Sequence, residues 1–345
     1  MKKLDGYSLM IVSKYFTSIK DFINVILVCK KYKDTLDKFH FNPIPLNVRT
    51  RYFFPKIETL VIYTTKDYCF NEEKFFKKVV LYPVNYEDTQ NSDDNVEYKK
   101  VNYSKKDRNL FGNVVPLTIK SIANNCFYHN EFLKSVNIPN GVTSIGEMCF
   151  DNCLSLQSVS LPSTLLSIGN YCFLNCCKLS EIKLPMLLKQ LNDSCFVHCV
   201  SLTQIEIPKN VLSIGKFCFL GCKSLEKVII HKGLVLINQK CFSGCISLKT
   251  ITIPSTVTTI EECTFFGCSS LETIDLPAVK KIEDESFFRC SKLSKINFSK
   301  KLPKFGNSCF FDSLLNQKTL KIPSNAFLKP AWLSFIEENN FVHYW

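Results

Sequence analysis

Hydrophobic residues recur with a period of 23 from about residue 115 to residue 323. The clearest column begins at Cys126, and Cys returns every 23 residues up to Cys241, each time followed by Phe. The Phe column continues through Phe265, Phe287 and Phe310, with one step shortened to 22. A second Cys column lies four residues after the first, and its members are Cys153, Cys176, Cys199, Cys222, Cys245, Cys268 and Cys290. A repeat of this length predicts an array of similar units rather than a single globule.

Each unit predicts three local elements. Its consensus is Cys-Phe-x-x-Cys-x-x-Leu-x-x-Ile-x-Ile-Pro-x-x-Val-x-x-Ile-Gly, which the stretch from Cys149 to Gly169 illustrates. The Leu-x-x-Ile-x-Ile part alternates at its end, which predicts a short strand; the next residue, Pro, ends that strand because it has no N–H group to donate. The Val-x-x-Ile-Gly part predicts a second extended piece. The Cys-Phe-x-x-Cys-x-x-Leu part places Cys, Cys and Leu on one face of a short helical turn.

A single unit of this kind is not stable by itself. About seven apolar side chains per unit contribute about 1.5–3 kcal/mol each when buried. Ordering the backbone costs about 1–2 kcal/mol for every residue. The units must therefore stack, each covering its neighbour. We predict an α/β-solenoid that is rich in β-structure, with short helical turns, and roughly 40 Å long at about 4.8 Å per coil.

The unit resembles the BspA-like, treponemal-type class of leucine-rich repeats. The resemblance runs from about Val115 to Pro323, roughly 60% of the chain. It implies a curved solenoid and a role in adhesion or protein binding, often at a cell surface. Members of the class often have Ala where this chain has its first Cys column, a conservative change at a small buried site. Asp5 and Lys14 interrupt the apolar stretch of a signal peptide. We therefore expect a cytoplasmic protein, and cell-surface association is implied by the resemblance alone.

Four segments follow from these patterns. Residues 1–45 are expected to form a small N-terminal helical segment, and residues 46–112 are irregular degenerate repeats or strands. The leucine-rich repeat solenoid occupies residues 113–323. Residues 324–345 are expected to form a C-terminal helical cap in which Pro330 begins a helix.

The N-terminal stretch from Tyr15 to Tyr32 resembles an F-box. The usual opening Leu-Pro is absent, and Tyr32 replaces Trp. The resemblance implies docking to a Skp1-type adaptor of a ubiquitin ligase through Phe16, Phe22, Val28 and Cys29. The same apolar residues also suit a helical cap on the open end of the solenoid, with Asp21 capping the second helix. Both interpretations stay open.

Charge and composition argue against nucleic-acid binding, a membrane span and a zinc site. The net charge of +12 is spread along the chain, which is a poor signature for nucleic-acid binding, and we expect none. No segment approaches the roughly 20 apolar residues of a membrane span. Of the 18 cysteines, 14 fall in the two columns. We expect these cysteines to be small buried apolar residues. A zinc site would need paired Cys-x2-Cys or Cys/His spacing, whereas the spacing here is Cys-x3-Cys. A disulfide ladder between coils would require export.

No catalytic motif is present. The sequence has no phosphate-binding Gly loop, no Gly-x-Ser-x-Gly and no His-Glu-x-x-His. Its five His residues are scattered. We therefore expect a protein that is not an enzyme, has no cofactor or metal site, and is a monomer.

The strand positions between the buried residues are expected to point outward and to form one exposed face. Its two columns contain Ser135, Asn137, Ser158, Ser160, Glu181, Lys183, Gln204, Glu206, Lys227, Ile229, Thr250, Thr252, Thr273, Asp275, Lys295 and Asn297. Both charge signs occur and nothing repeats, which disfavours a regular ligand such as a phosphate backbone and favours a protein partner. We expect a non-catalytic protein–protein interaction scaffold. An F-box-type substrate adaptor and an unconventionally exported surface adhesin are the alternative hypotheses.

Overall fold

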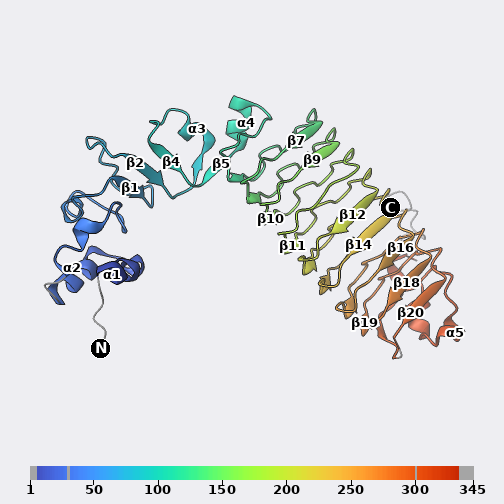
Figure 1. The fold of residues 1–345 in the computed structure, drawn as a ribbon. Helices are drawn as coiled ribbons and strands as arrows, with labels where there is room; N and C mark the ends of the chain where they lie inside the picture. Colours follow the sequence, from blue (N-terminus) through green and yellow to red (C-terminus); the bar gives the residue numbers. More distant parts are fainter. Residues whose placement is uncertain (1–5, 29–31, 300, 334–345) are drawn as a thin grey trace. The chain divides into compact units, whose positions relative to one another are not determined.

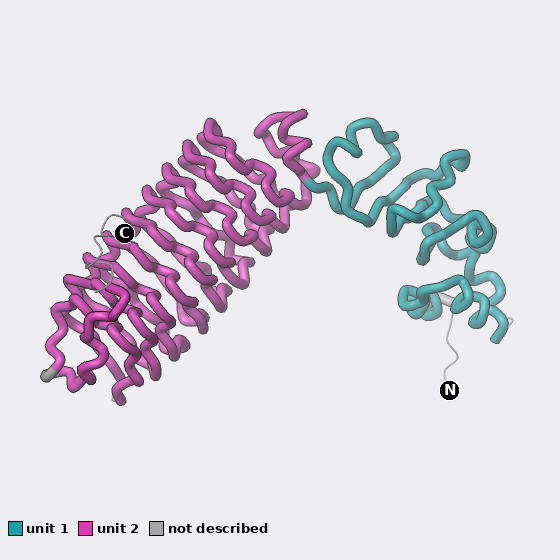
Figure 2. Tube along the Cα trace, turned by 180° about the vertical axis from the view of Figure 1, so that it is seen from behind, with its two compact units in different colours: residues 1–102 teal, residues 103–345 magenta. Residues whose placement is uncertain are grey.

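The structure is a computed structural model that describes residues 6–28, 32–299 and 301–333. The chain divides into two compact units, with the boundary between Asn102 and Tyr103 (Figure 2).

The first unit begins with short helices and continues with short strands (Figure 1). Its elements are α1 (Gly6–Val12), η1 (Ser13–Tyr15), α2 (Ile19–Val28), η3 (Leu36–Lys38), η4 (Arg51–Phe53), β1 (Thr59–Ile62), β2 (Lys77–Val80), β3 (Val84–Asn85), α3 (Tyr86–Thr89), β4 (Val96–Tyr98) and β5 (Val101–Tyr103). Strands β1, β2 and β4 form a parallel sheet in that order. Strand β3 pairs in parallel with β5.

Aromatic rings fill the core of the first unit. Phe22 of α2 is 3% exposed, and its ring meets the rings of Phe16, Phe39 and Phe54 edge to face, with centroids 4.9–5.8 Å apart. Edge-to-face contacts bring the positive edge of one ring to the negative face of another. The N-terminal helical segment therefore packs on residues that follow it in the first unit, such as Phe54, and shares one core with them.

Asp21 contributes to the cap of α2 from inside the first turn, because the helix begins at Ile19, two residues earlier than the predicted cap. Its carboxylate accepts hydrogen bonds from the backbone N–H groups of Thr17 and Ser18 at 3.0 and 2.8 Å. The Ser18 hydroxyl also donates to it at 3.0 Å. These bonds, the backbone bond from Ser18 foremost, lower the pKa of Asp21, because they favour the charged carboxylate.

The second unit is the predicted solenoid. Helix α4 (Lys105–Phe111) comes before the coils, and α5 (Gln317–Leu320) and η5 (Ser324–Phe327) follow them. The longer strands are β7 (Ser135–Asn137), β9 (Ser158–Ser160), β12 (Gln204–Ile207), β14 (Lys227–Ile230), β16 (Thr250–Thr252), β18 (Thr273–Leu276) and β20 (Lys295–Phe298). The two-residue strands are β6 (Ser121–Ile122), β8 (Ser144–Ile145), β10 (Ser167–Ile168), β11 (Gln190–Leu191), β13 (Ser213–Ile214), β15 (Leu236–Ile237), β17 (Thr259–Ile260), β19 (Lys281–Ile282) and β21 (Lys304–Phe305).

Parallel pairing joins strands of successive coils. The longer strands form a pair, β7-β9, and a five-stranded sheet, β12-β14-β16-β18-β20. The two-residue strands run in the orders β6-β8-β10, β11-β13-β15 and β17-β19-β21. Residues 181–184 keep the predicted alternation of exposed and buried side chains, but they form no strand. The longer strands therefore fall into two sheets instead of one.

The Cys-Phe segment of each coil is a hydrogen-bonded turn that does not extend into a helix. Met148 and Asn152 have φ angles of 51° and 57°, and residues in this left-handed region cannot continue a right-handed helix. The N–H groups of Met148, Phe150 and Asn152 instead donate to carbonyl groups of the next coil at 2.8–2.9 Å. Other coils repeat this pattern, so neighbouring coils are joined along a third edge as well as through their strands.

The Phe column forms one continuous stack inside the solenoid. Neighbouring ring centroids lie 5.0–5.6 Å apart, and the ring planes differ by at most 20°. Every ring in the column is 0% exposed, and the members are Phe127, Phe150, Phe173, Phe196, Phe219, Phe242, Phe265, Phe287 and Phe310. Near-parallel rings at this spacing are offset stacks. Each coil therefore hides its Phe against the coil before it.

The second Cys column bonds to the backbone of the Phe column. The thiol of Cys199 donates to the carbonyl oxygen of Phe173 in the preceding coil at 3.2 Å. The other six members make the same contact at 3.1–3.3 Å. A buried polar group left without a partner costs about 1–3 kcal/mol, so this thiol does more than fill space. Burial raises the pKa of the Cys222 thiol to about 12.

Candidate protein-binding face

The sixteen residues predicted to point outward do so, and we call them the strand face. Fourteen are exposed, while Ile229 and Thr273 are partly buried. The residues between them in the chain are buried: Val136 is 6% exposed and Ile205 is 2% exposed. The alternation follows from the pleat of a strand, which turns successive side chains to opposite sides.

The pairing of strands places face residues of successive coils side by side. Gln204 lies opposite Lys227, and Glu206 lies opposite Ile229. Asp275 lies opposite Asn297, whose amide donates to the Asp275 carboxylate at 2.6 Å. Adjacent parallel strands are about 4.7–4.9 Å apart, so the strand face is a close array on a backbone held by hydrogen bonds.

Charge on the strand face is concentrated in its middle coils. Glu181, Lys183, Glu206 and Lys227 are all exposed there, and His231 lies 2.9 Å from the Glu206 carboxylate. In the coils at either end, most positions of the strand face carry hydroxyl or amide side chains. The strand face therefore offers hydrogen-bond donors, acceptors and both signs of charge.

A third exposed column borders the strand face, and the sequence analysis missed it. It lies one position before the first column and contains Lys134, Gln157, Ser180, Thr203, Glu226, Lys249, Glu272 and Ser294, all exposed. The sequence does contain a signal for this column, because the position is polar in every coil and a repeated polar position indicates exposure. Lys249 lies 3.9 Å from Glu226 of the preceding coil, so successive members of this column interact across coils.

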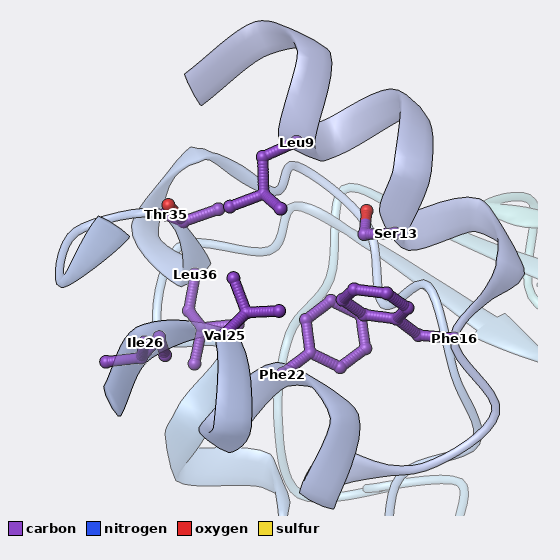
Figure 3. A pocket seen from close by; sticks show the side chains of 8 residues that line it. All are labelled: Leu9, Ser13, Phe16, Phe22, Val25, Ile26, Thr35 and Leu36. Carbon is purple, nitrogen blue, oxygen red and sulfur yellow. The ribbon is translucent and has the colours of Figure 1, made fainter. Parts of the chain in front are cut away.

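The N-terminal residues that resemble an F-box do not share one surface. Phe22 is buried in the core, so it supports the interior of the first unit rather than a docking surface. Phe16 is partly buried and, with Phe22, lines a small apolar cavity between α1 and α2 (Figure 3). Val28 is 82% exposed and the preceding Leu27 is 77% exposed. Cys29 lies outside the described residues.

Residues 6–28, 32–299 and 301–333 lack two other kinds of functional feature. Within them, no group of three or more His, Cys, Asp or Glu side chains is placed to hold a metal ion. Nor does any helix in these ranges have the length and apolar character needed to cross a membrane.

The coil geometry agrees with a known family of repeats. The family model described as "BspA type Leucine rich repeat region" matches in six copies, over residues 103–225 and 212–331. These ranges cover well over half of the chain. The chain belongs to the BspA-type leucine-rich repeat family. The strand face lies wholly within the BspA-type repeats, whereas the segment that resembles an F-box lies outside them. No curated protein matches the sequence.

Several solved structures similar to this BspA-type chain come from bacteria. A leucine-rich repeat protein of Bacteroides ovatus is 23% identical, with 68% of this chain and 73% of that one covered and a TM-score of 0.49. A leucine-rich cell surface protein of Faecalibacterium prausnitzii is 20% identical, with 71% and 84% covered and a TM-score of 0.36. A leucine-rich repeat protein of T. pallidum is 24% identical, with 60% and 80% covered and a TM-score of 0.33.

Proposed function

We propose that the protein is a non-catalytic scaffold that binds a protein partner on the strand face. The observation that carries the proposal is the exposure of both predicted columns along successive coils, on a backbone joined by parallel ladders on either side of residues 181–184. A repeat array presents such a surface as its main working feature. Because the ladders already order the backbone, binding costs little further conformational entropy.

The chemistry of the strand face favours a folded protein partner over a polymer with a regular repeat. Carboxylates, amines and an amide follow one another along the face in no regular order, through Glu181, Lys183, Gln204, Glu206 and Lys227. Protein interfaces are mixed in this way, with polar groups that fix register and suppress wrong partners.

A charge swap on the strand face tests the proposal. The variant Glu181→Lys, Lys183→Glu, Glu206→Lys, Lys227→Glu reverses the local charges and leaves the net charge unchanged. The control variant Glu131→Lys, Lys223→Glu makes matched swaps at exposed positions outside the face. Partners cross-linked to the wild-type protein are identified and titrated against all three proteins. We expect at least tenfold weaker binding for the strand-face variant alone, with its melting temperature unchanged. Equal affinity for all three proteins would refute the assignment.

The F-box-type substrate adaptor is the second candidate function. It is favoured by the exposure of Leu27 and Val28 at the end of α2, two apolar side chains on the segment that carries the resemblance. The full chain is titrated with a recombinant Skp1-type adaptor, alongside the variants Val28→Glu and Val48→Glu. Val48 is 66% exposed in the same unit and outside that segment. Saturable binding lost only in Val28→Glu supports the adaptor function, and no binding to wild type rules it out.

A further inference from the structure

A different surface of the solenoid carries a cluster of exposed apolar side chains. It lies along the strands β10, β11, β13 and β15 and the turns that precede them, and β10 and β11 are labelled in Figure 1. We call it the short-strand face. Its apolar members are 37–55% exposed: Leu166, Met186, Leu187, Leu212, Val235 and Leu236. By contrast, none of the sixteen residues of the strand face is a large apolar side chain with comparable exposure.

Hydrogen bonds between successive coils fix the backbone on which these side chains stand. The N–H group of Leu212 donates to the carbonyl of Lys189, and the N–H group of Val235 donates to the carbonyl of Leu212, both at 2.8 Å. The side-chain amide of Asn210 donates to the carbonyl of Met186 at 2.7 Å. The column from Leu166 to Val235 makes three coil steps, which is about 14 Å at the spacing of parallel strands. Lys189 takes the place of an apolar residue in this column, between Leu166 and Leu212, so apolar and basic side chains are interleaved on the face. The six apolar residues gather on four successive coils, unlike the scattered exposed apolar residues of an ordinary surface.

Lysines outnumber carboxylates in the coils that carry this cluster. The second halves of its coils, residues 162–171, 185–194, 208–217 and 231–240, contain five lysines and a single carboxylate, Asp193. Asp193 is engaged as an acceptor for the backbone N–H of Lys216 at 2.8 Å. Lys189, Lys209 and Lys232 are exposed, and none of them makes an ion pair with any residue that the structure describes. Elsewhere in the same unit Lys281 does make one, with Glu283.

We propose that the short-strand face docks an acidic amphipathic segment of a partner protein, with apolar side chains on the cluster and carboxylates on the lysines. The cluster supplies apolar area, and the unpaired lysines supply charge complementarity and orientation. A membrane surface fits less well. Faces that insert into a membrane are typically those of amphipathic helices, whose apolar side is buried about 5–10 Å deep. These side chains instead stand on two-residue strands and turns and are close to half buried. This docking does not depend on the strand face.

The test uses a displayed library of random 16-residue peptides selected against the full-length protein. Enriched peptides are synthesised with a fluorescent label and titrated by anisotropy. Two variants address the proposal: Leu212→Glu with Val235→Glu removes the apolar centre, and Lys209→Glu with Lys232→Glu reverses the rim. Phe132→Glu with Ile246→Glu is the control, since both residues are exposed and apolar but lie outside the short-strand face. The strand-face charge swap is titrated in parallel.

We expect enriched peptides to combine leucine-type residues with an excess of Asp and Glu. Affinity is expected to fall at least tenfold in both short-strand variants and to stay unchanged in the control and in the strand-face variant, with all melting temperatures equal. Failure to enrich such peptides, or equal affinity in the short-strand variants, overturns the proposal. Sedimentation with phosphatidylserine vesicles, lost in Leu212→Glu with Val235→Glu, would assign the face to a membrane instead. Concentration-dependent dimerisation lost in that variant would assign it to a second copy of this chain.

Discussion

Replacing Phe196 with alanine removes one ring from the middle of the buried stack. The Phe196 ring is 0% exposed and lies between Phe173 and Phe219, with centroids 5.2 and 5.4 Å away and planes 8° and 3° apart. The backbone N–H of Phe196 donates to the Cys218 carbonyl at 2.8 Å. Ladder bonds of this kind run through the neighbouring coils as well, so the coils cannot close the gap by sliding together.

The expected cost follows from this geometry. Truncation of a buried Phe to Ala destabilises proteins by about 3–5 kcal/mol, and the cost is highest where the site cannot collapse. Each aromatic pair contributes about 0.5–1.5 kcal/mol beyond area burial, and this position loses two pairs at once. We therefore expect the Phe196→Ala variant to lose about 4 kcal/mol or more of unfolding free energy. Phe132→Ala is the matched control, because Phe132 is 90% exposed and surface changes stay within about 0.5 kcal/mol.

Urea denaturation followed by far-ultraviolet circular dichroism measures both variants. The free energy in water comes from linear extrapolation, and an unchanged slope with urea shows that the same structure unfolds. A loss below about 1.5 kcal/mol for Phe196→Ala, well under the range for a buried Phe, would refute the stacked core. Equal losses for Phe196→Ala and Phe132→Ala would refute it too.

Three further predictions concern titratable groups. In the native protein, maleimide should label the partly buried Cys69 and Cys177 and spare the two buried Cys columns until denaturant is added, as peptide mapping by mass spectrometry would show. Burial raises the pKa of Cys195 and Cys222 to about 12. Their stabilising contribution is therefore complete below the unfolded pKa of about 8.5–9 and is lost as pH rises towards 12; a melting temperature that stays level across this window would contradict it. Since the pKa of Asp21 is lowered in the fold, its contribution is lost as pH falls below about 4. Asp21→Asn should speed amide hydrogen exchange in α2 at pH 7, and unchanged exchange would count against the cap.

The stacking of coils was predictable because it depends on spacing alone. Side chains that return every 23 residues must superpose when the chain closes each turn at the same length, and the single step of 22 did not break the Phe stack. The left-handed turn residues were only half visible. Asn152 and Gly221 tolerate positive φ. Met148 and Phe217 also have positive φ, although their residue types do not favour it. Hydrogen bonds from their N–H groups to the next coil hold them in this conformation, and the sequence of one coil does not reveal those bonds.

The outward direction of the strand face was also predictable, since it follows from alternation with buried residues. The absence of a strand at residues 181–184 was not predictable, because this coil has the same residue pattern as the others. Whether a ladder forms depends on the alignment of the neighbouring backbones, which the pattern of one coil does not show. The short-strand face was invisible for a different reason. Within one coil, Leu212 has the same apolar character as its buried neighbour Val211, and only the superposition of successive coils brings Leu212 next to Val235.

The most direct test of the account is a set of distances along one column of the strand face. Spin labels are attached to a genetically encoded keto amino acid, which avoids the native thiols, at the position pairs 158 and 273, and 135 and 295. Double electron–electron resonance then reports the separation of each pair. Five and seven coil steps predict distances of about 24 and 34 Å at about 4.8 Å per coil. Two short distances that do not grow with the number of coils would contradict a stacked solenoid and the binding face built on it.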